Sequence, residues 1–177
     1  PIDRELTTKI MAFKQLKVNA VASQMSRGKL EKSTAMALSS IGSSLSKMCM
    51  DICLYMGQDF DFISFPADLT TGSSIMPHKK NPDLFELVRG KCNSLQGLPN
   101  QLALLTANLP SGYHRELQLA KGPIIDAVQE LKSCLDILLF SLPQLKVSQN
   151  TTDQKKYDYL FSVDSLNADV IAGKPFR

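Results

Sequence analysis

The chain has 177 residues and a formal net charge of +3, from 20 lysines and arginines against 17 aspartates and glutamates. This length suffices for one sizeable domain. Because the net charge is small and no long basic run is present, we expect no nucleic-acid partner. The apolar stretches are too short to span a bilayer and nothing at the start resembles a signal peptide, so we expect no membrane partner. Because the chain opens at Pro1 and not at a methionine, we expect a fragment of a longer protein.

Four cysteines, at positions 49, 53, 92 and 134, show no paired metal-ligand spacing, and neither of the two histidines is near them. We therefore predict buried thiols and no metal site. Thiols that are not cross-linked favour a reducing, cytoplasmic compartment.

The pattern from Asp3 to about Met25 is mixed, with apolar residues roughly at helical spacing, and residues 26–29 then interrupt it. Whether Gly28 ends a helix or lies inside one stays open. Residues 33–56 carry apolar side chains at intervals of three, four and seven, which predicts a long amphipathic helix that stops at Gly57. Its serines and Gly42 suit close packing between helices.

Residues 60–65 form a short apolar run that could be a strand, but we predict a loop because no second segment offers a strand partner. The loop at 70–83 follows, in which Gly72 and two prolines exclude regular structure. Asn81 before Pro82 predicts a helix start, with Asn81 as the cap and Pro82 at the first helical position. Such a terminus favours anions, and Lys79 and Lys80 beside it strengthen this preference.

Helical patterns fill the rest of the chain. They are predicted over 84–109 with a break at Pro99, over 113–121 with an end at Gly122 and Pro123, over 124–142, and over 151–159 and 165–172. A shift to polar composition near Val147 predicts a central helical region at 1–147 and the start of a C-terminal helical domain at 148–177. The fold class is therefore all-α, with long helices in a bundle.

The run from Gly72 to Pro82, Gly-Ser-Ser-Ile-Met-Pro-His-Lys-Lys-Asn-Pro, resembles the signature loop of the fumarase/aspartase superfamily of β-elimination lyases. The resemblance implies that Ser73 is the catalytic base, that Lys79 stabilises charge and that Asn81 binds substrate. Ser74 and Lys80 are weaker alternatives. His78 stands at a variable position and is expected to be solvated.

The chemistry agrees with these roles. In a β-elimination a base removes a proton beside a carboxylate, and the negative charge spreads into that carboxylate. A lysine ammonium and an asparagine amide at a helix N-terminus stabilise such charge. A serine hydroxyl made more acidic by these groups could serve as the base.

Residues 79–91 and 109–118 resemble the corresponding segments of the argininosuccinate lyase family. The resemblance implies substrate-binding roles for Tyr113, Gln118 and Lys121, the last two on one helix face. His114 replaces a usual asparagine and is expected to have no catalytic role. Two departures are that Leu119 and Ala120 replace acidic residues and that about two dozen extra residues lie within 14–36.

The resemblance further implies cleavage of argininosuccinate to arginine and fumarate without a cofactor, in a homotetramer with composite active sites shared among subunits. The general-acid histidine of the family lies in a His-Thr-Ser segment outside this chain, so we expect the fragment alone to be inactive. Two alternatives remain: another superfamily lyase, such as an adenylosuccinate lyase, and a non-catalytic, crystallin-like helical assembly protein.

Overall fold

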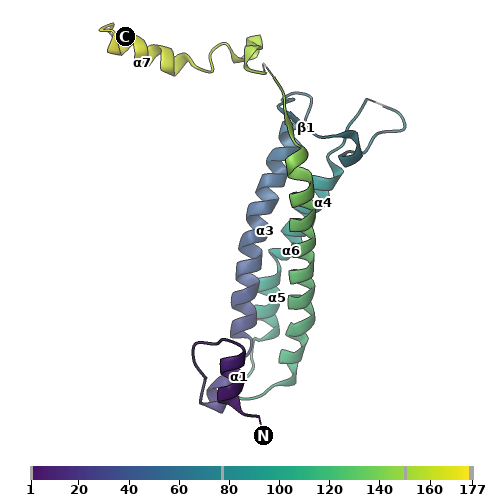
Figure 1. The fold of residues 1–177 in the computed structure, drawn as a ribbon, viewed down its shortest axis with the longest axis vertical. Helices are drawn as coiled ribbons and strands as arrows, with labels where there is room; N and C mark the ends of the chain where they lie inside the picture. Colours follow the sequence, from purple (N-terminus) through teal and green to yellow (C-terminus); the bar gives the residue numbers. More distant parts are fainter. Residues whose placement is uncertain (1, 77, 150, 176–177) are drawn as a thin grey trace. The chain divides into compact units, whose positions relative to one another are not determined.

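A computed structural model of the chain describes residues 2–76, 78–149 and 151–175 (Figure 1). Almost all of its regular structure is helical, which confirms the all-α prediction. The chain divides into two compact units, the first made of Pro1–Met48 and Leu87–Leu138 and the second of Cys49–Glu86 and Leu139–Arg177. The predicted boundary near residue 147 stays a prediction. None of the described helices is long and apolar enough to cross a membrane.

The first unit holds most of the helical residues. Its helices, three of which continue into the second unit, are α1 (Arg4–Ile10), α2 (Ala20–Met25), α3 (Lys29–Tyr55), α4 (Asp83–Leu95), α5 (Leu98–Leu105) and α6 (Lys121–Ser141). The long helices predicted over 33–56 and 124–142 are confirmed as α3 and α6. The expected interruption near Pro99 is also present, because α4 ends at Leu95 and α5 begins at Leu98.

The mixed, roughly helical pattern over residues 3–25 corresponds to two separate helices, α1 and α2. Asp3 caps α1 by accepting hydrogen bonds from Glu5 N and Leu6 N at 3.1 and 2.9 Å. Asn19 caps α2 by accepting from Ala22 N at 3.0 Å. Each capping side chain satisfies backbone N–H groups that a continuous helix would have bonded internally, so the chain starts a second helix at residue 20.

Gly28 lies in the turn between α2 and α3, and not inside a helix, with a φ of +83°. This left-handed conformation suits glycine and not a residue with a Cβ atom. An added Cβ would also lie 2.8 Å from Thr106 Cγ2. Gly28 therefore turns the chain into α3 and lets this turn approach the end of α5 closely.

Replacement of Gly28 by alanine should lower the free energy of unfolding by about 1–3 kcal/mol, because it combines backbone strain with a steric clash. The urea denaturation midpoint measures this loss. Gly90→Ala is the matched control, since no atom lies within 4 Å of the added Cβ in α4. An equal loss in both variants would contradict the role of the Gly28 turn.

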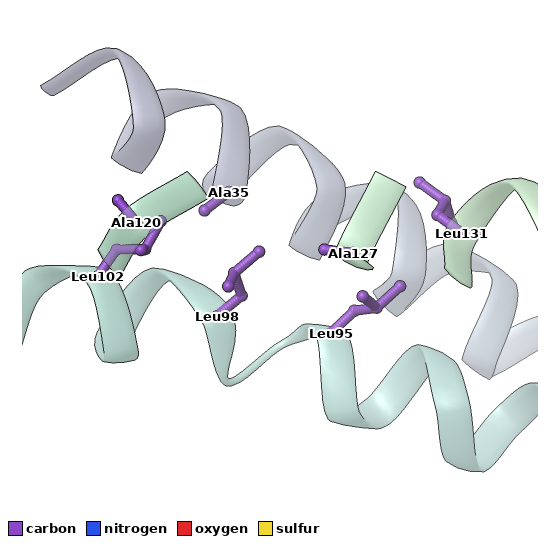
Figure 2. Packing of buried hydrophobic residues seen from close by; sticks show 7 residues of the cluster. All are labelled: Ala35, Leu95, Leu98, Leu102, Ala120, Ala127 and Leu131. Carbon is purple, nitrogen blue, oxygen red and sulfur yellow. The ribbon is translucent and has the colours of Figure 1, made fainter. Parts of the chain in front are cut away.

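The core of the first unit lies between α3, the α4–α5 segment and the start of α6 (Figure 2). Leu95, Leu98 and Leu102 extend from the α4–α5 segment into this core. They pack against the small residues Ala35, Ala120 and Ala127 and against Leu131. Small residues opposite large ones allow the helices to pack closely.

The prediction that small residues in α3 suit close packing is also supported at Gly42. A Cβ added there would lie 3.0 Å from the carbonyl oxygen of Cys92 in α4. One turn further along, the Ser46 hydroxyl donates a 2.6 Å hydrogen bond to Asn93 Oδ1. Helices α3 and α4 can therefore approach closely because Gly42 has no side chain, and the hydrogen bond between Ser46 and Asn93 joins them.

The helix predicted over 113–121 with an end at Gly122 and Pro123 is wrong. A 3₁₀ segment, η2 (Arg115–Ala120), leads directly into α6, which begins at Lys121. Pro123 lies in the first turn of α6, where its missing N–H would have no partner inside the helix. The proline therefore starts a helix here instead of ending one.

The second unit contains a short sheet that the sequence prediction missed. Strand β1 (Ile63–Ser64) pairs in antiparallel fashion with β2 (Lys146–Val147), with Ile63 opposite Val147. The run at 60–65 was predicted to lack a partner, and the partner proves to be a two-residue strand too short to show alternation. Its shorter elements are η1 (Ala67–Leu69), η3 (Leu142–Gln144), η4 (Thr151–Asp153), η5 (Lys155–Tyr157) and α7 (Ser162–Ile171). The helix expected over 151–159 is therefore two 3₁₀ turns, whereas α7 agrees with the one expected near 165–172.

Three of the four thiols are buried in the helix packing, as predicted, namely Cys49, Cys92 and Cys134, whereas Cys53 is half-buried. Burial raises the pKa of the Cys134 thiol above its ordinary value, while a hydrogen bond with Cys92 opposes this shift. In the folded chain the thiol therefore keeps its proton at a pH where the unfolded chain releases it.

This shift predicts a loss of stability in alkali. The favourable contribution of the neutral thiol is complete below the unfolded pKa of 9.0 and disappears as the pH rises through the higher folded pKa. Urea midpoints should thus fall above pH 9, and less steeply in Cys134→Ala than in the wild type. Identical pH profiles of the two proteins would show that this thiol does not contribute.

Candidate active site

The loop at 70–83 belongs to the second unit and is closed by a short stem. Thr71 N donates to Asn81 O at 3.2 Å, and Asn81 N donates to Thr71 O at 2.9 Å. Helix α4 begins at Asp83, with Phe85 N and Glu86 N both donating to Pro82 O. The helix start is thus confirmed. The predicted cap is wrong by one residue, because Pro82 occupies the N-cap position that was predicted for Asn81, and Asn81 lies in the stem. The expected proline at 77 lies outside the described residues.

Aromatic packing beneath the stem fixes both ends of the loop. The rings of Phe65 and Phe85 lie 4.6 Å apart between centroids, and both side chains are buried. Thr71 Oγ1 donates a hydrogen bond to the Asp83 carboxylate. The segments before and after the loop are therefore joined by an apolar contact and a polar one, as precise positioning of functional side chains requires.

Ser73 lies at a turn near the first end of the loop and is half-buried. Its Oγ accepts hydrogen bonds from Ile75 N and Met76 N, each at 3.2 Å. Two backbone N–H dipoles directed at one oxygen favour negative charge on it. Ser74, the weaker alternative for the base, is exposed.

A pocket of about 680 Å³ lies beside the second half of the loop. The loop contributes Lys79, Lys80 and Asn81 to its lining, and His78 lies among them, exposed as expected. The opposite lining comes from the end of α3 and the turn after it. Ser73 is not among the lining residues, so the structure brings Lys79 and Asn81 to one pocket but does not bring the predicted base to it.

Sequence reasoning missed two carboxylates of this pocket, Asp59 and Asp61. Neither forms an ion pair with Lys79 or Lys80 among the residues that the structure describes. Asp61 has a φ of +47°, so the turn after Gly57 is sharp and directs the chain back along α3. The only signal in the sequence was their position directly after a predicted helix stop.

The predicted substrate-binding residues Tyr113, Gln118 and Lys121 belong to the first unit. Gln118 Nε2 donates to the Tyr113 hydroxyl at 3.4 Å, so these two side chains lie together. The shared helix face expected for Gln118 and Lys121 stays a prediction, because Gln118 is in η2 and Lys121 begins α6. Lys121 is exposed at the first position of α6. All three polar side chains are accessible, while Leu117 and Ala120 are buried and anchor the segment.

The structure explains one of the two departures from the usual acidic residues. Ala120 is 1% exposed and is part of the core of the first unit, where an acidic side chain would be buried without a partner. Leu119 is 65% exposed, so an acidic side chain at this position would not be buried. The alanine is therefore a packing residue, and nothing in the structure explains the leucine.

His114 is held by the chain around it, because its Nε2 lies 2.8 Å from Pro110 O. Since a carbonyl only accepts, this nitrogen carries the proton in that contact. Within 2–76, 78–149 and 151–175, no cluster of three or more histidine, cysteine or acidic residues could hold a metal ion.

The chain combines long packed helices with a Ser/Lys/Asn loop that leads into a helix start. Residues 2–97 match a family profile described as Lyase, and the chain belongs to this family. Relatives named argininosuccinate lyase are similar over all 177 residues, with 49% identity in Parabacteroides distasonis, 47% in Phocaeicola vulgatus and 37% in Xylella fastidiosa. The chain covers 40% of each of these relatives. The predicted resemblance is thereby confirmed.

Solved structures confirm the fold class. A fumarate lyase:delta crystallin from Brucella melitensis aligns with a TM-score of 0.77 at 17% identity, covering 98% of this chain and 43% of its own. A class II fumarase from Schistosoma mansoni aligns with a TM-score of 0.69 at 16% identity, covering 98% and 42%. An EDDS lyase variant with bound fumarate gives 0.64 at 19% identity, covering 100% and 35%. At these identities the comparison shows the bundle fold and not the reaction.

Proposed function

We propose that the protein containing this chain is an argininosuccinate lyase, which splits argininosuccinate into arginine and fumarate without a cofactor. The observation that carries the proposal is that argininosuccinate lyases are 46–49% identical to this chain over its whole length, through both the loop and the segment around Tyr113. The chain covers only 40% of the length of those relatives. We therefore assign the activity to the whole protein in its oligomeric form, called the assembled protein below, and not to this chain alone.

Ser73 acts as the base in this proposal. It removes a proton from the carbon beside a carboxylate of the substrate, and the C–N bond to the leaving guanidinium nitrogen then breaks. The N–H groups of Ile75 and Met76, each 3.2 Å from Oγ, support this role because they favour the deprotonated oxygen. The leaving nitrogen takes a proton from a histidine outside this chain.

Lys79 and Asn81 stabilise the intermediate, in which the negative charge resides on the carboxylate oxygens. Both residues line the loop pocket, and the N-terminus of α4 follows directly after them. A cation, an amide and helix N–H groups aimed at a developing anion lower the barrier most when they are fixed before the reaction. The stem between Thr71 and Asn81 provides this rigidity.

Tyr113, Gln118 and Lys121 recognise the substrate in this proposal. The ammonium of Lys121 suits a carboxylate, and the paired hydroxyl and amide of Tyr113 and Gln118 offer hydrogen bonds to polar groups. All three side chains are accessible, as a binding role requires. We assign this segment and the loop to composite active sites that different subunits complete.

A homotetramer is the assembly that we propose, and the apolar surface of α6 supports it. Ile125, Val128 and Leu135 are 54%, 45% and 38% exposed, at intervals of three and seven residues along one helix face. A second apolar face on a helix that already packs into a core is typical of a contact with another subunit. The cysteine pattern supports a cytoplasmic location.

The test is product analysis with the assembled protein and argininosuccinate. Arginine, measured by chromatography, and fumarate, measured by ultraviolet absorbance, should appear in equal amounts. Adenylosuccinate is offered in parallel, and its exclusive cleavage would identify the other lyase activity. Release of no fumarate from either substrate would overturn the proposal and favour a non-catalytic helical assembly protein.

A further inference from the structure

We propose that a second pocket, in the first unit, binds a small anion through carboxylate or phosphate oxygens. It encloses about 300 Å³ between the turn that precedes α3 and the chain from Thr106 to Leu117. It shares no lining residue with the loop pocket. Its cationic wall comes from the turn between α2 and α3 and from the first residues of α3.

Three cations line this pocket: Arg27, Lys29 and Lys32. No acidic residue is in the lining, and none of the three forms an ion pair among the described residues. The Glu31 carboxylate is not in the lining but lies at its edge, where Oε2 accepts from the backbone N–H of the lining residue Gly28 at 2.7 Å. Like charges gathered in a cavity repel one another, and an anion between them removes this cost.

One buried side-chain atom in the same lining, on the half-buried Gln24, points to a ligand independently of the charges. Gln24 Nε2 is inaccessible to solvent and has no hydrogen-bond partner in the described part of the chain. An unpaired buried donor is costly, so such groups in native proteins usually meet a partner that protein atoms do not supply. An anionic oxygen would accept from this amide and from the surrounding cations together.

The wall of the pocket that contains His114 and Leu117 has a fixed shape. Arg27 Nη2 donates to Leu117 O at 3.2 Å, and Leu117 is itself buried. His114, also in the lining, is held by its contact with Pro110 O. The guanidinium and imidazole are thus positioned before any anion arrives, which reduces the entropic cost of binding. A volume of about 300 Å³ leaves room for phosphate or a C4 dicarboxylate.

Isothermal titration calorimetry of the assembled protein tests the proposal, with inorganic phosphate and succinate as separate probes. Lys32→Met should weaken binding about tenfold or more, because a charge-assisted hydrogen bond is lost. Lys47→Met is the matched control, since it removes the same charge from α3 outside the pocket. The probe that binds more tightly identifies phosphate or carboxylate as the preferred chemistry.

Two further variants separate this pocket from the loop pocket and from unspecific effects. Binding should persist in Lys79→Met and should weaken in Gln24→Leu, which removes the orphaned amide while the circular dichroism spectrum stays native. Binding that is lost in Lys79→Met but kept in Lys32→Met would assign the anion to the loop and overturn the proposal. Equal weakening in Lys32→Met and Lys47→Met, or no binding of either probe, would overturn it as well.

Discussion

Replacement of Ser73 by alanine should lower the kcat of the assembled enzyme about 10²–10⁴-fold, the usual contribution of a general base. The KM for argininosuccinate should change little, because the hydroxyl acts on one proton and not on the charged groups that bind substrate. The folded state should persist, since Ser73 is only half-buried and its bonds to Ile75 N and Met76 N lie within one exposed turn. Steady-state fumarate formation measures the loss.

Ser74→Ala is the matched control for this prediction. It removes the neighbouring hydroxyl from the same loop, at an exposed position without the two N–H donors. Its kcat should stay within a few-fold of the wild type. If Ser74→Ala lost the activity and Ser73→Ala kept it, the base would be the second serine of the loop. Full activity in both variants would exclude a serine base.

Lys79→Met should lower kcat about 10²–10³-fold, the loss typical when one group that stabilises a developing anion is removed. Methionine keeps the length of the side chain and removes its charge. The effect is expected to be smaller than that of Ser73→Ala, because Asn81 and the N-terminus of α4 remain. Rate measurements at saturating argininosuccinate give this value.

A substrate analogue with a nitro group in place of the charge-accepting carboxylate isolates the role of Lys79. Its deprotonated form resembles the intermediate and should bind wild type far more tightly than the substrate does. Lys79→Met should lose most of this advantage, whereas Lys80→Met should keep it. An unchanged affinity in Lys79→Met would show that the lysine acts elsewhere than on the intermediate.

Helices with long apolar periods were predictable because one face of each is buried along many turns. Helix α3 carries such a pattern and was located within a few residues of its observed ends. Local chemistry decided the places where the prediction failed. Asp3 and Asn19 are both ordinary capping residues, and recognising the second would have revealed the break before α2. Pro123 was misread as a stop because a proline in a first turn and one after a last turn look alike in sequence.

The short sheet could not be foreseen, because β2 consists of two residues and its pairing with β1 depends on distant parts of the chain. The same limit applied to the site. The loop was recognisable from its residue types in one short window, and its helix start from Pro82 and the acids that follow. The pairing of Thr71 with Asn81 depends on tertiary structure and gave no local signal. The only signal for Asp59 and Asp61 was their position after a predicted helix stop, and their place in the pocket also depends on tertiary structure.

The most direct test of the proposed reaction is a comparison of kcat/KM for argininosuccinate and adenylosuccinate, with the assembled enzyme and fumarate as the common product. The proposal predicts rapid cleavage of argininosuccinate and at most a trace of reaction with adenylosuccinate, because a site built for one leaving group leaves its polar groups unpaired with another. Equal or greater kcat/KM for adenylosuccinate would contradict it.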